Sequence, residues 1–505
     1  MRVLIRTDAS TSIGSGHVMR CLALAEVLAR SGMEVKFIAR QMPDSLIARI
    51  RSAGFESICM QPANSSSCTG SLAHSHWLRM GPLEDAKETI RTLTTLGDVD
   101  WLIVDHYGID ATWEQLVREH VGRLFVIDDL ADRAHVCDLL LDQTLDSGAA
   151  ERYQKLVPVL CRRLLGPRYA LLRSEFIRER TKKPVHTGKV NRLLVFLGGS
   201  DPGNYTSIAL DALDLIKKRR FQVDVVVGSI NVHRGDIERR CREMPDVRFH
   251  CDVLDMASLL AASDLVIGAG GTNTWERACL GLPSIVIAVA PNQRVQTAAM
   301  AELGAIIELP ARDLSPQVIA GAITMLMANP DRLCEMSRIS AGLVDGRGAE
   351  RVARELSAAP LVLRRATAAD SDALHQWRNA EEVRRYSHDS APIGLDTHRT
   401  WLMSVLADQA RDLLIAEQND RPVGVLRYDR CGTSATVSIY LVPGHSGQGL
   451  GPRILLAGDR WLDHHHPEVR TVIAEVLPDN KASARAFIEA GYEQGPETYI
   501  KRLRR

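Results

Sequence analysis

The stretch Gly14-Ser15-Gly16-His17-Val18-Met19-Arg20-Cys21 joins an apolar run to a helical pattern. Residues 3–5 before it predict a buried strand, and residues 19–30 carry apolar side chains at helical spacing. We therefore expect His17 where a strand turns into the start of a helix, beside glycines that let a ligand approach the backbone. The free N–H groups of a helix start suit a phosphate, and an imidazole placed there is a candidate catalytic base. A glycine-rich turn with an incidental histidine explains the stretch equally well.

The length, charge and cysteine content of the chain limit the classes of protein to which it can belong. Its 505 residues exceed what one hydrophobic core organises, so we expect two or three domains. Lysine plus arginine and aspartate plus glutamate number 62 each, which gives no electrostatic reason to expect nucleic acid or a membrane surface as partner. The ten cysteines include no C-x-x-C pair and indicate reduced thiols. Because neither a signal-peptide pattern nor a membrane-spanning apolar run is present, we expect a cytoplasmic protein.

Strand-like apolar runs alternate with helical patterns through the first third of the chain. The runs lie at residues 35–39, 101–104, 124–127 and 139–141. This alternation predicts a parallel sheet with helices on its faces. Two runs end in polar residues, Asp105-His106-Tyr107-Gly108 and Asp128-Asp129. Open parallel sheets bind ligands at the carboxyl ends of their strands, so these residues are expected to line a cleft with His17, although helix capping is the favoured role for Asp128 and Asp129.

A second α/β half follows a basic, polar segment at residues 178–191. Its first strand-like run ends in Gly198-Gly199-Ser200-Asp201, and a later run leads into a second glycine-rich stretch that ends at Glu276. Two such halves suggest a ligand held between two Rossmann-like domains. Neither glycine set forms a G-x-G-x-x-G fingerprint with an acidic residue at the expected spacing, so the sequence does not favour NAD.

The second glycine-rich stretch contains donors and a carboxylate at useful positions. Gly270, Gly271 and Thr272 offer backbone and hydroxyl donors for a phosphate. Glu276 lies one turn into the following helix, where a carboxylate can accept both hydroxyls of a ribose. The alternative is a glutamate that merely complements the helix dipole.

The chain changes character after a linker at residues 356–360. A strand predicted at residues 436–442 runs into Gly444-His445-Ser446-Gly447-Gln448-Gly449-Leu450-Gly451, and a helical pattern follows. A strand, a glycine-rich turn and a helix describe a cradle of backbone N–H groups for a pyrophosphate. The run His464-His465-His466 points in different directions at a helix end, so a solvated cluster is favoured and no metal is expected.

The first 350 or so residues resemble the UDP-2,4-diacetamido-2,4,6-trideoxy-β-L-altropyranose hydrolases of pseudaminic acid biosynthesis. The matching residues are Arg6-x-Asp8, Gly14-x-Gly16-His17-x-x-Arg20, Asp105-His106-Tyr107-Gly108, Tyr169-Ala170-Leu171-Leu172-Arg173-x-Glu175-Phe176 and Gly198-Gly199-Ser200-Asp201. They occur in both halves and in the family's order. That family in turn resembles glycosyltransferases with two facing Rossmann-like domains, notably the lipid II-forming N-acetylglucosaminyltransferase.

This resemblance implies a site and a reaction. His17 is implied as the base that activates water, and either Asp8 or Asp105 would orient it. Glu276 is implied as the ribose ligand. The implied substrate-binding residues are Gly14, Gly16, Arg20, Asp105, His106, Tyr107, Tyr169, Arg173, Gly199, Ser200, Asp201, Gly270, Gly271, Thr272, Asn273 and Glu276.

The last 145 residues resemble the GNAT superfamily of N-acetyltransferases. The Arg/Gln-x-x-Gly-x-Gly signature reads Ser446-Gly447-Gln448-Gly449-Leu450-Gly451, so serine replaces its first residue. The superfamily's common general-acid tyrosine is Phe487 here, which leaves Ser483 or a water to protonate the leaving thiolate. The implied acetyl-CoA contacts are Leu441, Val442, Gly447, Gln448, Gly449, Gly451 and Asn480.

Together these resemblances imply an α/β protein of three domains. Two Rossmann-like domains of glycosyltransferase-B type, at residues 1–180 and 190–356, would face each other across a cleft, and a GNAT domain would span residues 360–505. The expected activities are metal-independent, inverting hydrolysis of the UDP-sugar and acetyl-CoA-dependent N-acetylation of the 4-amino sugar nucleotide. A glycosyltransferase with an acceptor other than water and a non-catalytic acyl-CoA-binding module remain as alternatives.

Overall fold

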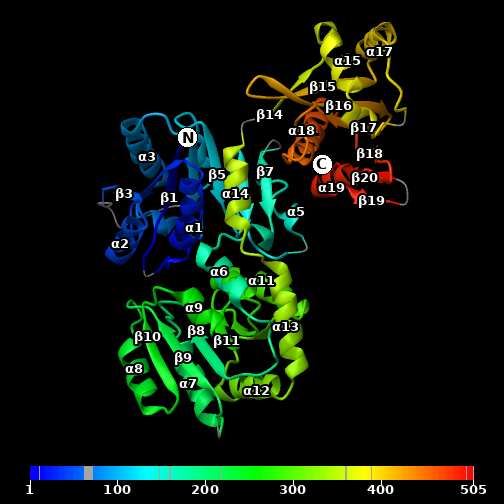
Figure 1. Ribbon diagram of the computed structural model, residues 1–505. Helices are drawn as coiled ribbons and strands as arrows, with labels where there is room; N and C mark the ends of the chain where they lie inside the picture. Colours follow the sequence, from blue (N-terminus) through cyan, green and yellow to red (C-terminus); the bar gives the residue numbers. More distant parts are fainter. Residues whose placement is uncertain are drawn as a thin grey trace. The chain divides into compact units, whose positions relative to one another are not determined.

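The computed structural model describes residues 1–10, 12–61, 72–146, 148–158, 161–217, 219–358, 361–387, 389–495 and 498–503. The chain forms two compact units, Met1–Ser357 and Ala358–Arg505. The first unit contains two parallel sheets and the second contains one mixed sheet (Figure 1). The α/β class predicted from the sequence is therefore confirmed. Residues 359 and 360 of the expected linker lie outside the described residues.

The first sheet is parallel throughout and runs in the order β3-β2-β1-β4-β5-β6-β7. Its strands are β1 Arg2–Thr7, β2 Glu34–Ala39, β3 Glu56–Cys59, β4 Trp101–Asp105, β5 Arg123–Ile127, β6 Leu139–Asp142 and β7 Arg162–Leu165. Successive side chains of β1 enter different cores: Val3 and Ile5 belong to one buried cluster and Leu4 to another. Both faces of the sheet are therefore covered, which explains its nearly continuous apolar strands.

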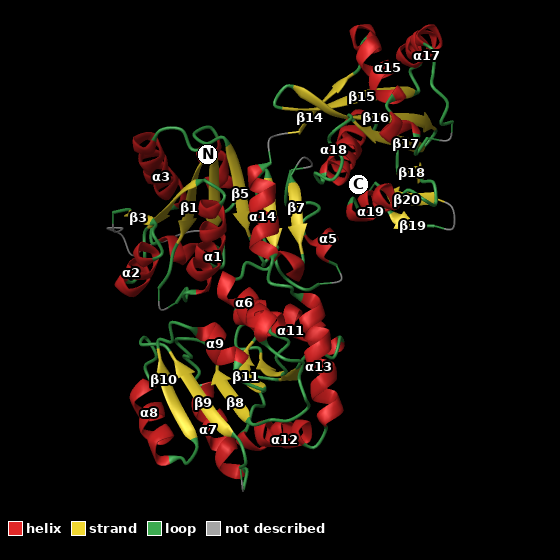
Figure 2. Ribbon diagram, viewed as in Figure 1, coloured by secondary structure: helices red, strands yellow, loops and turns green. Residues whose placement is uncertain are grey.

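Helices lie on both sides of this sheet (Figure 2). They are α1 Gly16–Arg30, α2 Asp44–Ser52, α3 Pro82–Leu96, α4 Ala111–Arg118 and α5 Ala149–Arg152, with short 3-10 turns η1 Ser75–Leu78 and η2 Pro167–Tyr169. The helix α14, Gly348–Ser357, comes from far along the chain and packs against α1. Its Leu356 carbonyl accepts a 3.0 Å hydrogen bond from Trp101 Nε1 of β4. We call this sheet and its helices, with α14, the first lobe.

The second sheet has the order β10-β9-β8-β11-β12-β13 and is also parallel. Its strands are β8 Arg192–Phe196, β9 Gln222–Val227, β10 Val247–Cys251, β11 Leu265–Ala269, β12 Ser284–Ile287 and β13 Ile307–Leu309. Its helices are α7 Tyr205–Leu215, α8 Arg234–Glu243, α9 Met256–Ala261, α10 Asn273–Cys279, α11 Arg294–Glu302, α12 Pro316–Met327 and α13 Pro330–Leu343, with the turn η3 Pro291–Gln293. This sheet and its helices form the second lobe.

The chain crosses between the lobes twice, at α6 (Ser174–Lys182) and just before α14. The two crossings touch, because a Cβ added at Gly348 would lie 2.5 Å from the carbonyl carbon of Tyr169. Arg180 fastens α6 to the second lobe by donating to the backbone carbonyls of Ala341, at 2.9 Å, and Val344, at 2.8 Å. These contacts fix the segment that carries the chain past the candidate site.

Asp128, at the end of β5, belongs to a buried charge cluster. Its carboxylate lies 2.9 Å from Arg133 Nη2 and accepts a 2.9 Å hydrogen bond from the hydroxyl of Tyr153. His135 contacts Glu114 through Nδ1 at 2.6 Å and lies 3.8 Å from Asp128. Burial lowers the pKa of His135, but Asp128 and Glu114 outweigh burial and raise it from 6.5 to about 9. The helix-capping role predicted for Asp128 is therefore wrong: buried cations and a buried tyrosine use its carboxylate instead.

The C-terminal unit has a mixed sheet in the order β14-β15-β16-β17-β18-β20-β19. Its strands are β14 Leu361–Arg365, β15 Arg411–Gln418, β16 Arg421–Cys431, β17 Ser434–Leu441, β18 Thr471–Glu475, β19 Glu493–Gln494 and β20 Thr498–Arg502. Its helices are α15 Ser371–Asn379, α16 Glu381–Arg384, α17 Leu395–Ala407, α18 Leu450–His465 and α19 Lys481–Glu489, with the turn η4 Ala368–Asp370. The parallel strands β17 and β18 pair only from Ser434 to Thr436 on β17, so in the described residues the rest of β17 has no ladder on that side.

Candidate active site

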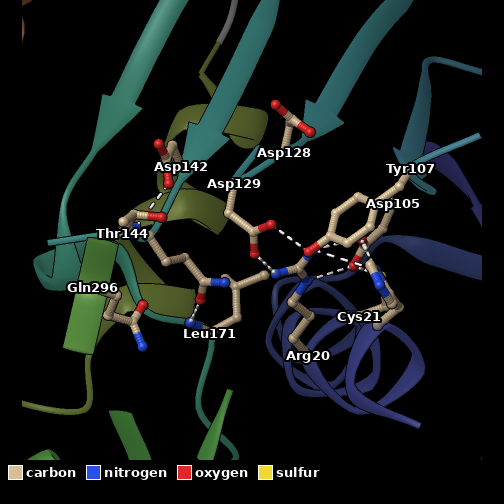
Figure 3. A network of polar contacts seen from close by, with 12 residues as sticks. Arg20, Cys21, Asp105, Tyr107, Asp128, Asp129, Asp142, Thr144, Leu171 and Gln296 are labelled. Atoms are coloured by element: carbon tan, nitrogen blue, oxygen red, sulfur yellow. Dashed lines mark hydrogen bonds and ion pairs between the residues drawn. The ribbon is translucent and has the colours of Figure 1, made fainter. Parts of the chain in front are cut away.

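His17 occupies the first turn of α1, directly over the carboxyl end of β4. Its Nδ1 lies 2.5 Å from Oδ1 of Asp105, the last residue of β4. Arg20, one turn further along α1, donates to the same carboxylate through Nε at 2.6 Å and Nη2 at 2.7 Å. Figure 3 shows this guanidinium between Asp105 and Asp129, to which Nη1 donates at 2.9 Å. The helical spacing of His17 and Arg20 thus aims both side chains at one strand end.

The charge on Asp105 determines which nitrogen of His17 carries the proton. Burial alone would raise the pKa of Asp105, but the adjacent Arg20 and His17 outweigh burial and hold it well below its usual range. An ionised carboxylate only accepts hydrogen bonds, so the short contact requires a proton on Nδ1 of His17. Nε2 then carries the lone pair. This is the tautomer that a general base needs.

Aromatic rings fix the plane of the imidazole. The ring of Tyr107 meets His17 edge-on at a centroid distance of 4.6 Å, and Trp77 does so at 5.8 Å. Tyr107 and Trp77 stack on each other at 5.3 Å, and the Tyr107 hydroxyl donates to Asp129. His17 is 7% exposed. Sequence reasoning did not identify Trp77, and the available signal was the pair His76-Trp77 within the turn Ser75–Leu78.

Asp8 lies in a separate buried network. Its carboxylate accepts from Arg6 Nη1 at 2.6 Å and from the backbone amide of Arg40 at 2.7 Å, and it lies 3.3 Å from Nε2 of His106. None of the described contacts of Asp8 reaches His17. His106 Nδ1 accepts from the amide of Gly108, so this imidazole is enclosed rather than available to a ligand. Of the two carboxylates proposed to orient His17, the structure therefore selects Asp105.

The glycine-rich stretch of the second lobe reaches the first lobe at the start of α1. A Cβ added at Gly16 would lie 3.0 Å from Oγ1 of Thr272, the residue before α10. Thr272 makes no side-chain capping hydrogen bond. Gly270 lacks room for a side chain, because a Cβ there would lie 3.1 Å from Cβ of Gln293. The loop expected to hold UDP is therefore adjacent to His17.

The other polar residues of that stretch have partners within the protein. Asn273 Oδ1 accepts from Arg277 Nη1 at 2.9 Å. Glu276 lies 3.6 Å from Arg173 Nη2, and Arg173 also pairs with Glu175 at 2.6 Å. Burial raises the pKa of Glu276, with Arg173 acting in the opposite direction. The structure thus brings Arg173 and Glu276 together, although they are about a hundred residues apart.

Five other implied substrate ligands lie in the loops, helix starts and cores of the two lobes. Asp201 accepts from the amides of Tyr205, at 3.0 Å, and Thr206, at 2.8 Å, so its carboxylate closes the start of α7. Gly199 lies against Gly228, because a Cβ added at Gly228 would lie 3.0 Å from the Cα of Gly199. Tyr169 packs on the core of the first lobe. Ser200 is half-buried next to Asp201, and Gly14 has the positive φ of 79° that the turn before α1 requires.

In the C-terminal unit the glycine-rich turn leads into α18 as predicted. Gly447 and Gly449 have φ angles of 77° and 69°, and no atom lies within 4 Å of a Cβ added at either. Gln448 Nε2 donates to the Gly444 carbonyl at 3.2 Å. A turn with this backbone, opening the 16-residue helix Leu450–His465, presents free N–H groups and suits a pyrophosphate.

Residues beyond that turn also have defined roles. Asn480 accepts from the amide of Ser483 at 3.0 Å and so caps α19. Phe487 is buried and packs on Tyr492, so it belongs to the core. The amide of Val442, just after Leu441 ends β17, already donates to the Val423 carbonyl at 3.0 Å. A cavity of about 620 Å³ beside the end of β17 is lined by His375, Gln376, Trp377, Asn379, Ala380, Val442 and Pro443.

Within the described residues, no cluster of three or more histidine, cysteine, aspartate or glutamate side chains could hold a metal ion. His465 instead bonds to the Trp461 carbonyl and His466 lies 3.0 Å from Asp412. The described helices also include none that combines the length and apolar character needed to cross a membrane.

Comparison with known proteins assigns both units to recognisable groups. Residues 193–352 match the glycosyltransferase family 28 C-terminal domain, and residues 360–493 match the acetyltransferase (GNAT) domain. The first unit thus contains a region similar to the glycosyltransferase family 28 C-terminal domain, and the second unit contains a region similar to the acetyltransferase (GNAT) domain. Both resemblances drawn from the sequence, and the fold class they implied, are confirmed.

Several individual proteins are similar to parts of this chain. The chain is 25% identical over 311 residues to the UDP-2,4-diacetamido-2,4,6-trideoxy-beta-L-altropyranose hydrolase of Campylobacter jejuni, covering 61% of this chain and 99% of the relative. It is 25% identical over 295 residues to protein MJ1062 of Methanocaldococcus jannaschii, covering 57% of this chain and only 55% of that relative. The crystal structure of Acinetobacter baumannii MurG aligns over 70% of this chain and 99% of its own, with 15% identity and a TM-score of 0.49.

Proposed function

We propose that the unit Met1–Ser357 hydrolyses a UDP-linked sugar of the diacetamido-trideoxy-altropyranose type, with water as the acceptor and His17 as the general base. The observation that carries this proposal is the contact of His17 Nδ1 with Asp105, which leaves the lone pair on Nε2. The nearness of Gly16 to Thr272 supports a UDP group held next to that nitrogen. The similarity to the Campylobacter hydrolase supports the substrate class.

The reaction follows from these positions. Nε2 takes a proton from water as the water oxygen bonds to the anomeric carbon and the bond from that carbon to the UDP oxygen breaks, so the configuration inverts. UDP is a good leaving group, and its developing charge would be met by backbone N–H groups at Gly270–Thr272 and at the start of α1. No metal is required for these steps. General-base assistance of this kind contributes roughly a hundred- to ten-thousand-fold to the rate.

We propose a smaller set of substrate contacts than the sequence resemblance implied. Gly16, Thr272, Gly270, Gly271 and Glu276 remain as candidate contacts to the nucleotide. Arg20, Asp105, Tyr107 and Asp129 act on His17 or on one another, and Asp201 closes a helix start. They are proposed to shape the site rather than to touch the sugar.

We propose that the C-terminal unit transfers acetyl from acetyl-CoA to the 4-amino group of the UDP-sugar, the step before hydrolysis in pseudaminic acid biosynthesis. The pyrophosphate would lie on the turn Gly447–Gly451, and the acceptor amine in the cavity beside Trp377 and Asn379. The neutral amine attacks the thioester, and the proton that the thiolate needs comes from Ser483 or a water. Because the Val442 amide is engaged, the oxyanion would be met by amides earlier on β17, where β18 no longer pairs. The described cysteines are free thiols, which fits a cytoplasmic site for both reactions.

One experiment tests the hydrolase proposal. The purified protein should release UDP from the UDP-linked diacetamido sugar with no acceptor added, and His17→Ala should lower the rate by roughly a hundredfold or more. UDP release only after an acceptor is supplied would favour the glycosyltransferase alternative. NMR of the first-formed sugar reports the anomeric configuration, and retention would contradict direct attack by water.

A second experiment tests the acetyltransferase proposal. Incubation with acetyl-CoA and the UDP-4-amino sugar should produce free CoA thiol and a product 42 Da heavier, about the mass of an added acetyl group replacing a proton. Binding of acetyl-CoA without thiol release would show that this unit is a non-catalytic binding module.

A further inference from the structure

Arg173 lies at the point where the chain passes from the first lobe to the second. It is the residue before α6, and its side chain is 7% exposed. Nη1 lies 2.6 Å from Oε1 of Glu175, and Nη2 lies 3.6 Å from Oε1 of Glu276 on α10. Its guanidinium also lies 5.3 Å above the ring of Phe176. Two carboxylates and an aromatic face thus surround this guanidinium.

Glu276 sits among charges from several elements. Arg173 and Glu175 reach it from α6 and its start, Arg277 and the Cys279 thiol lie on its own helix, and Arg49 acts on it from α2. Glu26 on α1 faces the same cluster through Glu175, Arg173 and Arg49. The side chain of Glu276 is 18% exposed, so it is nearly enclosed but still reachable. A carboxylate in this position loses hydration, and a charge partner decides whether it stays ionised.

We propose that Arg173 is a positioning residue for ribose recognition: its guanidinium pairs with the Glu276 carboxylate and holds it turned toward the nucleotide, without touching the nucleotide itself. This inference rests on the proposed role of Glu276 as the ribose ligand. It reassigns Arg173, which the sequence resemblance implied as a substrate ligand. A protonated Glu276 accepts fewer hydrogen bonds from the two ribose hydroxyls, so loss of Arg173 should make ribose recognition sensitive to pH.

The test compares binding of UDP and 2′-deoxy-UDP by isothermal titration calorimetry between pH 5.5 and pH 8.0. Both ligands carry the same diphosphate, so the ratio of their affinities cancels its protonation and reports the 2′-hydroxyl alone. In the wild-type protein the ratio should favour UDP across this range. In Arg173→Met the ratio should match wild type at pH 8.0 within a few-fold and fall toward one as the pH is lowered. Because the affinity ratio follows the protonation of Glu276, loss of a cation that lowers the pKa of this carboxyl should move the loss of preference to higher pH.

Three further variants separate this role from a structural one. Arg173→Lys keeps the charge and should restore the wild-type profile. Lys182→Met removes a cation from the same helix that pairs with Glu179 and not with Glu276, and should change nothing. Glu175→Gln frees Arg173 from its closer partner and should move the loss of preference to lower pH than in the wild-type protein, so these two proteins are also compared below pH 5.5, down to about pH 4.5. This last variant keeps Arg173 in place, so it tests the proposal even where Arg173→Met does not fold.

The outcomes are distinct. If Arg173→Met and Glu175→Gln both follow the wild-type ratio at every pH, Arg173 does not position Glu276 and the inference is overturned. If the wild-type protein binds UDP and 2′-deoxy-UDP equally, or Glu276→Gln leaves the ratio unchanged, the ribose role of Glu276 itself fails. Loss of all UDP binding in Arg173→Lys, despite a folded protein by circular dichroism, would point to direct contact with the nucleotide and would also overturn the inference.

Discussion

Replacing Asp105 by asparagine should cost the unit Met1–Ser357 both catalysis and stability. The carboxylate takes hydrogen bonds on both oxygens: Oδ1 from His17 Nδ1 and Arg20 Nη2, and Oδ2 from Arg20 Nε. An asparagine has one acceptor and one donor group in the same space. Either His17 or Arg20 must then face an N–H instead of an oxygen, and at His17 this favours the tautomer with the lone pair on Nδ1. The base for water is lost in that tautomer.

The magnitude follows from the two effects. Inverting the tautomer of a catalytic histidine while its position is kept lowers kcat by roughly a thousand- to ten-thousand-fold. Removing one partner of a buried ion pair costs about 3–5 kcal/mol of unfolding free energy. Because Arg20 keeps its 2.9 Å contact with Asp129, we expect the lower end, about 3 kcal/mol. Both effects should appear in one variant, the first in UDP release and the second in urea denaturation.

The matched control is Asp8→Asn, which also removes a buried carboxylate from an arginine but touches no atom of His17 among the described residues. It should lose a similar 3 kcal/mol or so of stability and keep kcat within about tenfold of wild type. Steady-state UDP release at pH 7.5 compares the two variants, each at a temperature where it is folded. If Asp105→Asn retained more than a tenth of the wild-type kcat, or if Asp8→Asn lost as much, the assignment of Asp105 as the partner of His17 would be refuted.

Three other predictions concern separate parts of the chain. The pKa of His135 is about 9 in the fold against 6.5 for an ordinary histidine, so its stabilising charge is fully present below pH 6.5 and is lost as the pH rises through 9; urea midpoints should fall over that range, and less steeply in His135→Gln. Gly348→Ala places a Cβ against the backbone of Tyr169 and Ala170, and should lower the free energy of unfolding by about 3 kcal/mol or prevent folding. Gly321→Ala lies inside α12 with open space around it, and should raise the free energy of unfolding by roughly 0.5–1 kcal/mol in the same denaturation assay. Gly449→Ala and Gly432→Ala both strain a backbone with positive φ by about 1–2 kcal/mol, but only Gly449→Ala should weaken acetyl-CoA binding measured by calorimetry.

The sequence predicted the parts of this protein that repeat a local pattern. Apolar runs at residues 3–5 and 101–104 became β1 and β4 because a strand covered on both faces needs continuous apolar side chains. The glycine-rich turn before α18 was equally visible, since positive φ at Gly447 and Gly449 demands glycine. Periodicity and turn chemistry are properties of adjacent residues, and a sequence shows those directly.

The sequence did not predict which charged residues far apart in the chain would contact each other. Nothing local distinguishes Asp8 from Asp105 as the partner of His17, because Asp8 directly follows β1 and Asp105 ends β4 of the same sheet. The two strands differ in what packs above them: Arg20 of α1 lies over Asp105, while Arg6 and His106 enclose Asp8. The capping role expected for Asp129 is wrong for the same reason, since it binds Arg20 and Tyr107 instead. A helix cap is a local explanation, and buried cations from other elements outweigh it.

The same reasoning explains why the candidate site depends on arginine. Asp105 would not remain ionised in a buried position without Arg20, and burial raises the pKa of Glu276 against Arg173. Each acidic group proposed to act on the substrate or on its base is therefore matched to one guanidinium, which stays charged throughout the pH range of the cell. The two arginines thus balance buried negative charge around the place where we propose that water attacks, and His17 contacts one of the balanced carboxylates.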